Sequence, residues 1–481
     1  MKNIKKYSLI GIVMVLFSTS CGDDFFDINT DPNLPGEASV QLVFPAGTAI
    51  TGFLIGGQYQ ILGGIWSQHW AQSVGASQYA NYDSYDIQST TLDARGYGEF
   101  YNGALNDLKY VRDQSLASEN WNYYLMSTVI TAYTYQVLTD LYDKIPFTDA
   151  LKGLDGLVQP TFDDGDVVYD GLITMLDDAL SRDLTLPSSI PPGADDIIFA
   201  GDMDRWVQFA NTLKLKIYMR QTNAREAVAS AGIQALFTEA NFLTSDAAMT
   251  QFVASLNRRN PVYETEVDFS GFPNLVLSNT LLNYLDNSVD GRLDALFNFP
   301  NDDTDGPHVG MAQGDFRAPT PVNKDGLSQP ALTATDAVYF MSTAESYFLQ
   351  AEAIARGYAT GDAKAMYEAG IDAAFARLGM ATDATLYGAG GAYEFPATNA
   401  NEEQIEAIIV QKWISMVNTQ GLESFLEQNR TGYPDFYSLA VNNVTSGNFP
   451  RRLLYPDTEI SSNKDNVPEQ VNVFTKVWWH K

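Results

Sequence analysis

Aromatic and hydrogen-bonding side chains are interleaved over one short stretch of the chain. Tyr79, Asn81, Tyr82, Asp83 and Tyr85 all lie within seven positions. Flat rings stack on the apolar C–H faces of pyranose sugars, while amide and carboxylate groups form hydrogen bonds with sugar hydroxyls. The pattern therefore favours contact with a neutral saccharide. The alternative is that the three tyrosines only cover a helix end.

A second candidate patch lies further along the chain, in a region rich in Pro, Gly, Asn and Asp. It contains ring, amide and basic side chains, namely Phe299, Asn301, His308, Phe316 and Arg317, of which we take Phe316 and Arg317 as candidate ligand contacts. Within it, Asn301–Gly306 resembles the start of an EF-hand calcium loop, but the twelfth position is Ala312 where such loops have a bidentate Glu. We therefore predict an acidic turn there and no metal site.

Signals for catalysis are weak in this sequence. The three histidines, His69, His308 and His480, lie in three separate regions. The sequence contains no His-Glu-x-x-His motif, no phosphate-binding loop and no Gly-x-Ser-x-Gly elbow. Two carboxylates are enough for a glycosidase, and the 59 acidic residues prevent the exclusion of such a pair by inspection. We expect a protein that is not an enzyme and needs no cofactor.

The charge balance restricts the partners. The 481 residues include 29 Lys and Arg against 59 Asp and Glu, which gives a net charge of −30. A field of that sign repels nucleic acid and favours neutral or cationic ligands. Hydrophobic residues make up 45% of the chain and charged residues 18%, so the sequence can bury a sizeable core and is not of the disordered class.

The first residues have the pattern of an export signal. Lys2, Lys5 and Lys6 precede a short apolar run, and the run stops at small residues next to Cys21, the only cysteine. This arrangement resembles a lipobox, which predicts a lipoprotein signal peptide over residues 1–20, lipidation of Cys21 and a lipidated lead segment over residues 21–45. The acidic pair after Gly22 resembles a signal for export to the outer surface. The alternative is an ordinary signal peptide with a lone Cys.

Apolar residues at helical spacing predict that the body is all-α. Helices are expected over residues 46–72, 96–116, 121–142, 168–180, 206–220, 225–238, 275–286, 342–357, 362–378 and 402–419. Ser342 to Glu345 fits a capping box, and the two helices that follow have the size of one tetratricopeptide unit. The region at about 255–335 is expected to be a loop region. Trp66 and Trp70 are four apart on one side of the first helix, a spacing that favours core packing, although Trp70 is also a candidate ligand contact.

Eight short motifs occur in an order that resembles the SusD/RagB outer-membrane lipoproteins, in the SusD-like branch. They are Asn29–Asn33, Leu141–Phe147, Gln159–Asp163, Trp206–Lys214, Ala351–Ala353, Gln411–Trp413, Arg430–Pro434 and Pro450–Leu453. The resemblance implies tetratricopeptide-like helix pairs that form a right-handed superhelical scaffold, with long irregular loops on one face and a single helical domain over residues 46–481. It also implies that the segment after the early helix contributes to a glycan-binding face.

The same resemblance implies a role. Members of the family are cell-surface nutrient-binding subunits that sit as a lid on a SusC-like TonB-dependent outer-membrane transporter and pass oligosaccharides, less often peptides, to it. The sequence therefore predicts a lipid-anchored glycan-binding protein without catalysis. A peptide-capture subunit, a surface glycoside hydrolase and a scaffold with only protein partners are the alternatives.

Overall fold

The computed structural model describes residues 38–74, 76–239, 241–269, 274–318, 326–397 and 401–480. Residues from Val40 onward form one compact unit. The predicted signal peptide over residues 1–20, the lipidation of Cys21 and most of the 21–45 lead segment lie outside the described residues.

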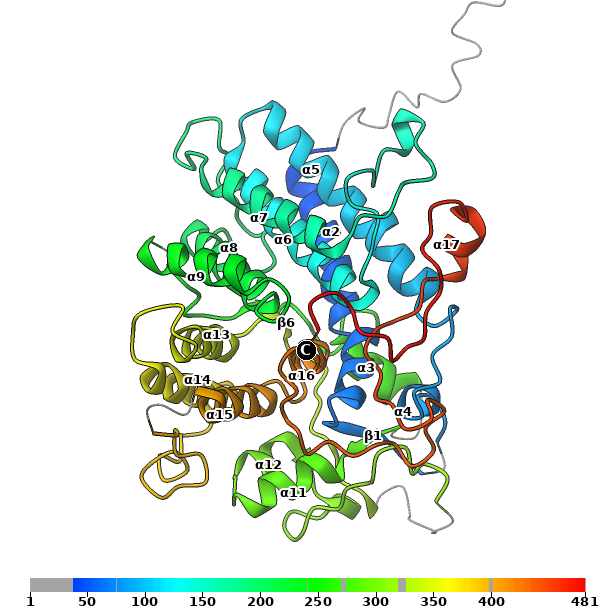
Figure 1. Cartoon of the computed structure of the whole chain (residues 1–481), viewed down its shortest axis with the longest axis vertical. Coiled ribbons are helices and arrows are strands. Elements are labelled where there is room, and N and C mark those ends of the chain that lie inside the picture. Colours follow the sequence, from blue (N-terminus) through cyan, green and yellow to red (C-terminus); the bar gives the residue numbers. More distant parts are fainter. Residues whose placement is uncertain are drawn as a thin grey trace, which may run out of the picture. The chain divides into compact units, whose positions relative to one another are not determined.

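Helices are the main regular structure of the unit that begins at Val40 (Figure 1). The longer ones are α2 (Val40–Ile55), α3 (Gln58–Trp66), α5 (Asn106–Ala117), α6 (Trp121–Tyr142), α7 (Gly165–Leu180), α8 (Met203–Arg220), α9 (Glu226–Glu239), α11 (Asn279–Asn287), α13 (Thr343–Ala355), α14 (Ala363–Arg377), α15 (Asn401–Ser415) and α16 (Gly421–Thr431). Shorter ones are α4 (Ala80–Asp83), α10 (Pro261–Tyr263), α12 (Arg292–Leu296) and α17 (Asp457–Ser462). The segments η2 (Asp93–Gly98), η3 (Phe100–Leu105) and η5 (Glu264–Phe269) have π-helical turns, and η4 (Gly153–Asp155) and η6 (Pro300–Asp302) have 3₁₀ turns.

The strands are short and antiparallel. Strand β1 (Trp70–Gln72) pairs with β3 (Leu275–Leu277), β2 (Ala247–Met249) with β6 (Val338–Met341), and β4 (Phe297–Asn298) with β5 (Gln329–Pro330). Each pair joins segments that are distant in the sequence, so the strands connect loops to the helical body and do not form a layer of their own.

Successive long helices pack against one another as the predicted all-α fold requires. Helix α5 lies against α6, α6 against α7, α7 against α8, and α8 against α9 and α13, while α13 also contacts α14 and α15 (Figure 1). The expected cap of α13 is present, because the Ser342 hydroxyl accepts a hydrogen bond of 3.2 Å from the Glu345 N–H. The prediction of tetratricopeptide-like helix pairs is therefore confirmed.

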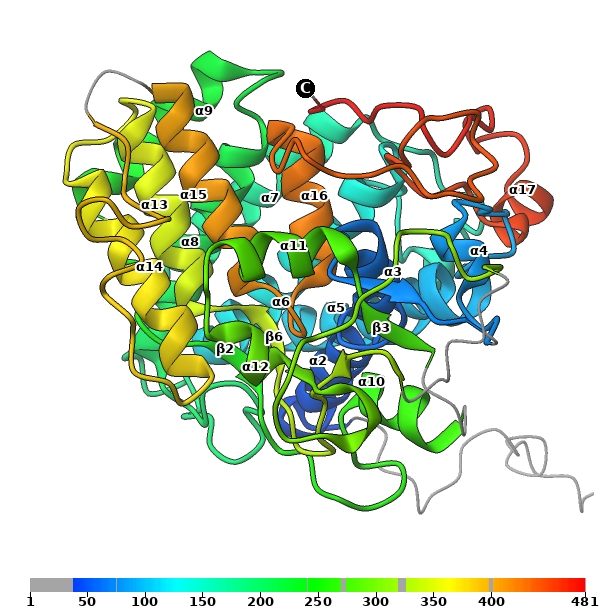
Figure 2. The ribbon, with the colours of Figure 1, turned by 90° about the horizontal axis from the view of Figure 1, so that it is seen from below.

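Helices α3 and α16 cross at backbone contact, and they lie side by side in both views (Figures 1 and 2). A Cβ atom on Gly421 would lie 2.5 Å from the Gly64 nitrogen, and one on Gly63 would lie 2.2 Å from the Leu422 nitrogen. The Gly421 N–H also donates a 2.7 Å hydrogen bond to the Gln60 side chain. Glycine is required here because any larger residue would force the two helices apart.

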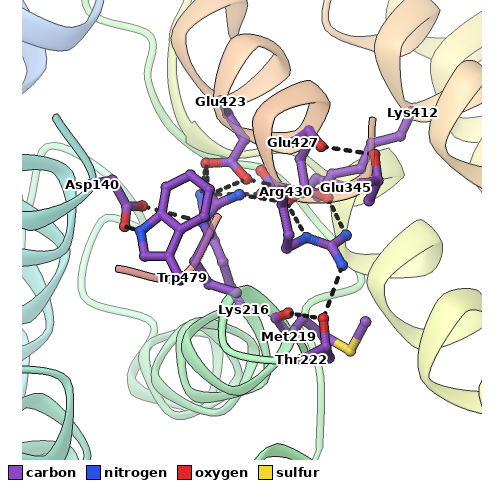
Figure 3. A network of polar contacts seen from close by, with 12 residues as sticks. Asp140, Lys216, Met219, Thr222, Glu345, Lys412, Glu423, Glu427, Arg430 and Trp479 are labelled. Atoms are coloured by element: carbon purple, nitrogen blue, oxygen red, sulfur yellow. Dashed lines mark hydrogen bonds and ion pairs between the residues drawn. The ribbon is translucent and has the colours of Figure 1, made fainter. Parts of the chain in front are cut away.

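A buried network of ion pairs connects α6, α8, α13, α15 and α16 (Figure 3). Five basic side chains face five acidic ones: Lys216, Arg220, Arg356, Lys412 and Arg430 against Asp140, Glu345, Glu352, Glu423 and Glu427. The Arg430 guanidinium donates to Glu352 at 2.7 and 2.6 Å and to Glu427 at 2.9 and 2.6 Å. Equal numbers of opposite charges, each in at least one ion pair, make such burial tolerable.

The C-terminal tail covers this network. The Trp479 indole donates a 2.8 Å hydrogen bond to Asp140 (Figure 3). The Arg220 guanidinium lies 5.3 Å from the Trp479 ring centroid. Trp479 is fully buried, as is Trp413 in α15. Both tryptophans are therefore structural.

Two parts of the helix prediction are wrong. The expected helix over residues 46–72 is interrupted at Gly56 and Gly57, where α2 ends and α3 begins, and its last residues form β1. Strand β1 is extended because it pairs with β3, with Trp70 opposite Leu277. The 255–335 region, expected to be a loop apart from the helix over 275–286, also contains β3, β4, β5 and α12. The expected helix is α11, which begins at Asn279 because residues 275–277 pair with β1 as strand β3. The stretch Val40–Trp66 is long and apolar enough to cross a membrane, but most of it is buried in the body.

Candidate functional site

Three segments far apart in the sequence meet around α4, and we call their combined surface the platform. It consists of residues 77–88, 311–317 and 436–444. Backbone hydrogen bonds join them, from Val444 N–H to Ser84 O at 3.0 Å and from Val441 N–H to Gln313 O at 2.8 Å. The structure thus brings the two candidate patches into contact.

Asp83 lies at the base of the platform. One oxygen of its carboxylate accepts a 3.0 Å hydrogen bond from Gln72 N–H, and the nearby Gly314 N–H and Gln313 amide also favour its ionised form. The Gln72 side chain in turn accepts a 2.7 Å hydrogen bond from Tyr79 N–H. Asp83 therefore holds β1, α4 and the 311–317 segment in fixed positions.

Burial changes the protonation of this carboxyl group. Desolvation raises the pKa of Asp83 to about 7, although hydrogen bonds from Gln72, Gly314 and Gln313 act in the opposite direction. At neutral pH the protonated and ionised forms are both populated. The rigidity of the platform is therefore expected to depend on pH near neutrality.

Two buried glutamines fix the remaining edges of the platform. Gln313 donates to the Ile65 and Trp70 carbonyls, both at 2.9 Å, and accepts a 3.1 Å hydrogen bond from the Ser278 hydroxyl. Gln68 accepts a 3.0 Å hydrogen bond from Ser438 N–H and donates to the Ser438 carbonyl at 2.6 Å. Such satisfied buried networks hold loops in one arrangement.

Tyrosine rings form the part of the platform that contains α4. The rings of Tyr79 and Tyr82 stack with centroids 6.0 Å apart and planes inclined by 16°. The Trp66 indole supports this pair by donating a 3.0 Å hydrogen bond to the Tyr82 carbonyl. Tyr79 is buried beside the Glu266 carboxylate, whereas Tyr82 is partly exposed. One member of the stack therefore reaches the surface.

Only some of the predicted ligand contacts are accessible. Asn81 and Tyr82 are partly exposed and Arg317 is exposed, with its guanidinium 5.6 Å from the Phe316 ring centroid. Five others are buried: Trp70, Tyr79, Asp83, Tyr85 and Phe316. Burial leaves little of these five side chains available for contact with a ligand. Residues 79–85 have a polar composition, which gave no sign that Tyr79, Asp83 and Tyr85 point into the body. There they form hydrogen bonds with Gln72 and Ala440.

The buried members have identifiable structural roles. The Trp70 indole donates a 2.9 Å hydrogen bond to Asn418, which agrees with the core packing that its spacing favours. The Tyr85 hydroxyl accepts a 3.3 Å hydrogen bond from Ala440 N–H, and Tyr85 has a left-handed backbone with φ of 62°. Tyr85 therefore holds the 436–444 segment close to α4, whereas Trp70 anchors β1 to Asn418.

Sequence reasoning missed the apolar edge of the platform. Phe436, Leu439, Val441 and Val444 are exposed, by 38%, 40%, 61% and 59%. Phe436 stacks one face on Tyr284, with centroids 5.1 Å apart and planes inclined by 12°. The sequence shows these four apolar residues within nine positions, but it does not show that they are exposed, because exposure depends on tertiary contacts.

A serine, a histidine and an aspartate form a chain of hydrogen bonds outside the platform. His308 Nδ1 lies 2.9 Å from the Ser328 hydroxyl, and His308 Nε2 lies 3.1 Å from Asp294. Ser328 is fully buried, and its hydroxyl accepts a 3.2 Å hydrogen bond from Val309 N–H. A buried hydroxyl cannot reach a substrate. These hydrogen bonds are therefore structural, and they attach the 308–309 loop to Ser328, which directly precedes β5.

The acidic turn at residues 301–306 is exposed at the residues whose side chains are described. Within the described ranges, no three His, Cys, Asp or Glu side chains come together in a way that could hold a metal ion.

Comparisons with known proteins agree with the fold. A chitin-binding protein is 24% identical, with a TM-score of 0.76 and coverage of 92% of this chain and 99% of its own. A SusD homolog from Bacteroides uniformis is 23% identical over 91% of this chain and 99% of its own, with a TM-score of 0.76. A chitin-binding SusD homolog from Flavobacterium johnsoniae is 21% identical over 92% and 98%, with a TM-score of 0.75. No curated protein matches.

A family assignment rests on the sequence itself. The family model of SusD-like proteins, described as "Starch-binding associating with outer membrane", matches residues 51–456. This range includes the helix pairs and the platform. The chain therefore belongs to the SusD-like family of carbohydrate-binding proteins that associate with the outer membrane.

Proposed function

We propose that this protein is a lipid-anchored, cell-surface receptor that binds oligosaccharides on the platform and serves as the lid of a SusC-like TonB-dependent transporter, without catalysis. The observation that carries the proposal is the platform itself. Asn81, Tyr82 and Arg317 reach solvent from segments that a buried hydrogen-bond network keeps in place. A ring, an amide and a guanidinium on a rigid surface match the apolar faces and the hydroxyls of a sugar.

The first ligands to test are chitooligosaccharides and maltooligosaccharides. Two of the similar structures are chitin-binding proteins, and the family description names starch. We expect dissociation constants in the micromolar range or weaker, because a lid must release what it captures. This corresponds to a binding free energy of about −8 kcal/mol or less in magnitude. Isothermal titration calorimetry against both series, with cellooligosaccharides for comparison, measures it.

Variants of Tyr82 test the platform. Tyr82→Ala removes the ring and is expected to weaken binding about tenfold, equivalent to about 1.4 kcal/mol, whereas Tyr82→Phe keeps the ring and most of the affinity. Tyr347→Ala is the matched control, because Tyr347 is also partly buried but lies on α13. If Tyr82→Ala binds as tightly as the wild type, ligand contact at α4 is refuted.

A peptide ligand is the second candidate, and the exposed apolar edge of the platform favours it. Leu439, Val441 and Val444 could accept apolar peptide side chains. Calorimetry against a pool of defined peptides distinguishes the two classes. Binding of peptides together with no heat from any saccharide would assign peptide capture.

The remaining parts of the proposal have separate tests. Mass spectrometry of the purified native protein is expected to show cleavage before Cys21 and acyl groups on its sulfur. Co-purification from outer membranes is expected to yield a SusC-like transporter. Incubation with the saccharides that bind is expected to release no reducing ends, and sustained release would identify a glycoside hydrolase instead.

A further inference from the structure

A cleft with a volume of about 670 Å³ opens between η2, η3 and α5 and the segment of residues 146–160. Residues of η2, η3 and α5 line one side, the 146–160 segment lines the other, and Glu459 of α17 is also among the lining residues. No platform residue belongs to this lining. A volume of this size is typical of pockets that hold small ligands.

One wall of the cleft offers hydrogen-bonding groups that the protein does not use. Asn102 and Asn106 are exposed, and their side-chain amides have no hydrogen-bond partner in the part of the chain that the structure describes. Tyr110 continues the same wall further along α5. Each amide can donate and accept, so the two amides can bind pairs of hydroxyl groups.

The opposite wall is apolar. Leu151, Leu154, Leu157 and Val158 line it, and Leu154 and Val158 are 106% and 78% exposed. The base of this segment is fixed, because the Thr161 hydroxyl donates to Asp149 at 2.7 Å and the Asn466 amide donates to the Gln159 carbonyl at 3.0 Å. Exposed apolar side chains on an anchored segment are a feature of interaction sites.

The two lysines that line the cleft are both paired with aspartates of the same lining, and the Glu459 carboxylate accepts a 3.4 Å hydrogen bond from the Asn463 amide. Lys109 is paired with Asp113 one turn away, and Lys152 lies 3.1 Å from Asp149. An ionic ligand would have to displace these pairs, whereas a neutral ligand would not. The cleft therefore suits an uncharged molecule with a hydroxyl-rich edge and an apolar face.

The backbone beside the cleft is unusual. The two consecutive segments η2 and η3 have π-helical turns, and Tyr97 and Tyr101 from these segments form the floor. The Tyr101 hydroxyl donates to the Pro146 carbonyl at 2.8 Å, which ties η3 to the opposite wall. Such wide turns occur frequently at functional sites.

We propose that this cleft is a second binding site, distinct from the platform, for a neutral saccharide. The hydroxyl groups of a pyranose ring face Asn102 and Asn106, and the C–H face of the ring lies against Leu154 and Leu157. The choice of a saccharide rests on the proposed function, whereas the existence of the site rests on the cleft alone.

Hydrogen–deuterium exchange of the purified mature protein tests the site, because it reports each segment separately. The probes are N-acetylchitotetraose and maltotetraose, added up to 10 mM. At least one is expected to slow exchange several-fold in residues 151–160. In Asn102→Ala/Asn106→Ala, the concentration needed for this protection is expected to rise tenfold or more. Asn283→Ala/Asn287→Ala is the matched control, with the same spacing on exposed positions of α11, and is expected to behave as the wild type.

The pattern of protection tests the cleft and the platform independently, because each site is reported by its own segment. Protection of residues 77–88 without protection of 151–160 would overturn the cleft and leave the proposed function intact. Protection of 151–160 alone would support the cleft and count against the platform. Protection of neither segment would overturn both. Protection of 151–160 that the double variant retains would also refute the assigned contacts.

Discussion

Replacement of Arg430 by methionine tests whether the buried ion network is a requirement of this fold. Arg430 is fully buried and donates four hydrogen bonds of 2.6 to 2.9 Å to Glu352 and Glu427. Arg430→Met keeps most of the side-chain volume but leaves two buried carboxylates with less compensation. Loss of one partner from a buried ion pair costs about 3–5 kcal/mol. Since the whole stability of a typical domain is about 5–15 kcal/mol, the effect should be plain.

The assay is urea denaturation followed by circular dichroism, with the midpoint and slope compared between variants. Lys364→Met is the matched control, because Lys364 pairs with Glu368 on the exposed side of α14. The control is expected to lose less than about 0.5 kcal/mol. If Arg430→Met unfolds at the same urea concentration as the control, the network does not stabilise the fold in the way described.

The pH dependence of the Arg430→Met deficit gives a further check. Burial alone raises the pKa of Glu427, but Arg430, Lys412 and Arg220 together outweigh it and hold the pKa well below its usual value. The stability from this depressed pKa is present above the unfolded value and is lost as the pH falls. Without Arg430 the carboxylates take up protons more readily. The deficit of the variant is therefore expected to be smaller at pH 4 than at pH 7.

Three further changes have defined outcomes. Burial raises the pKa of Asp83 to about 7, so the folded wild type loses stability as the pH rises from the unfolded-state pKa of this group through 7. Asp83→Asn does not titrate, and its unfolding free energy should therefore gain about 2 kcal/mol relative to wild type between pH 5 and pH 7.5, measured by urea titration. A difference that stays constant over this pH range would contradict the expectation. Gly421→Ala places a Cβ 2.5 Å from the Gly64 nitrogen and should lower the unfolding free energy by about 1–3 kcal/mol. The control Gly153→Ala, which has open space around the new Cβ, should leave the unfolding free energy nearly unchanged. Equal denaturation midpoints for the two variants would refute the close crossing of α3 and α16. Tyr82→Phe should leave the thermal midpoint of the protein almost unchanged, because the ring stack remains, and a large drop would show that the hydroxyl is structural.

The sequence predicted the helical body well because apolar periodicity and caps are local signals. Ser342 caps α13 as its position indicates, although Glu345 does not return to the cap and instead joins Lys216 in the ion network. Trp70 shows the limit of such reasoning. Its helical spacing from Trp66 was overridden by pairing with Leu277, which is remote in the chain.

The candidate site was predicted less well than the fold. Residue types at 79–85 indicated hydrogen bonding and stacking, but they could not show which side chains point inward. Asp83 and Tyr85 are buried because other segments of the chain pack against them, and the N–H groups of Gln72 and Ala440 donate hydrogen bonds to their side chains. The cleft was not found at all, since its walls at Asn102 and Leu154 become neighbours only after α6 reverses the chain.

The glycine contact between α3 and α16 has a consequence for the order in which the body can assemble. Gln60 and Gly421 are 361 positions apart and yet share a hydrogen bond, so α3 meets α16, its most extensive packing partner, only after most of the polypeptide has been made. Contacts of such long range form late and slowly. The platform also includes residues 436–444, which bond to Gln313 and Ser84, so it too is complete only in a nearly full-length chain.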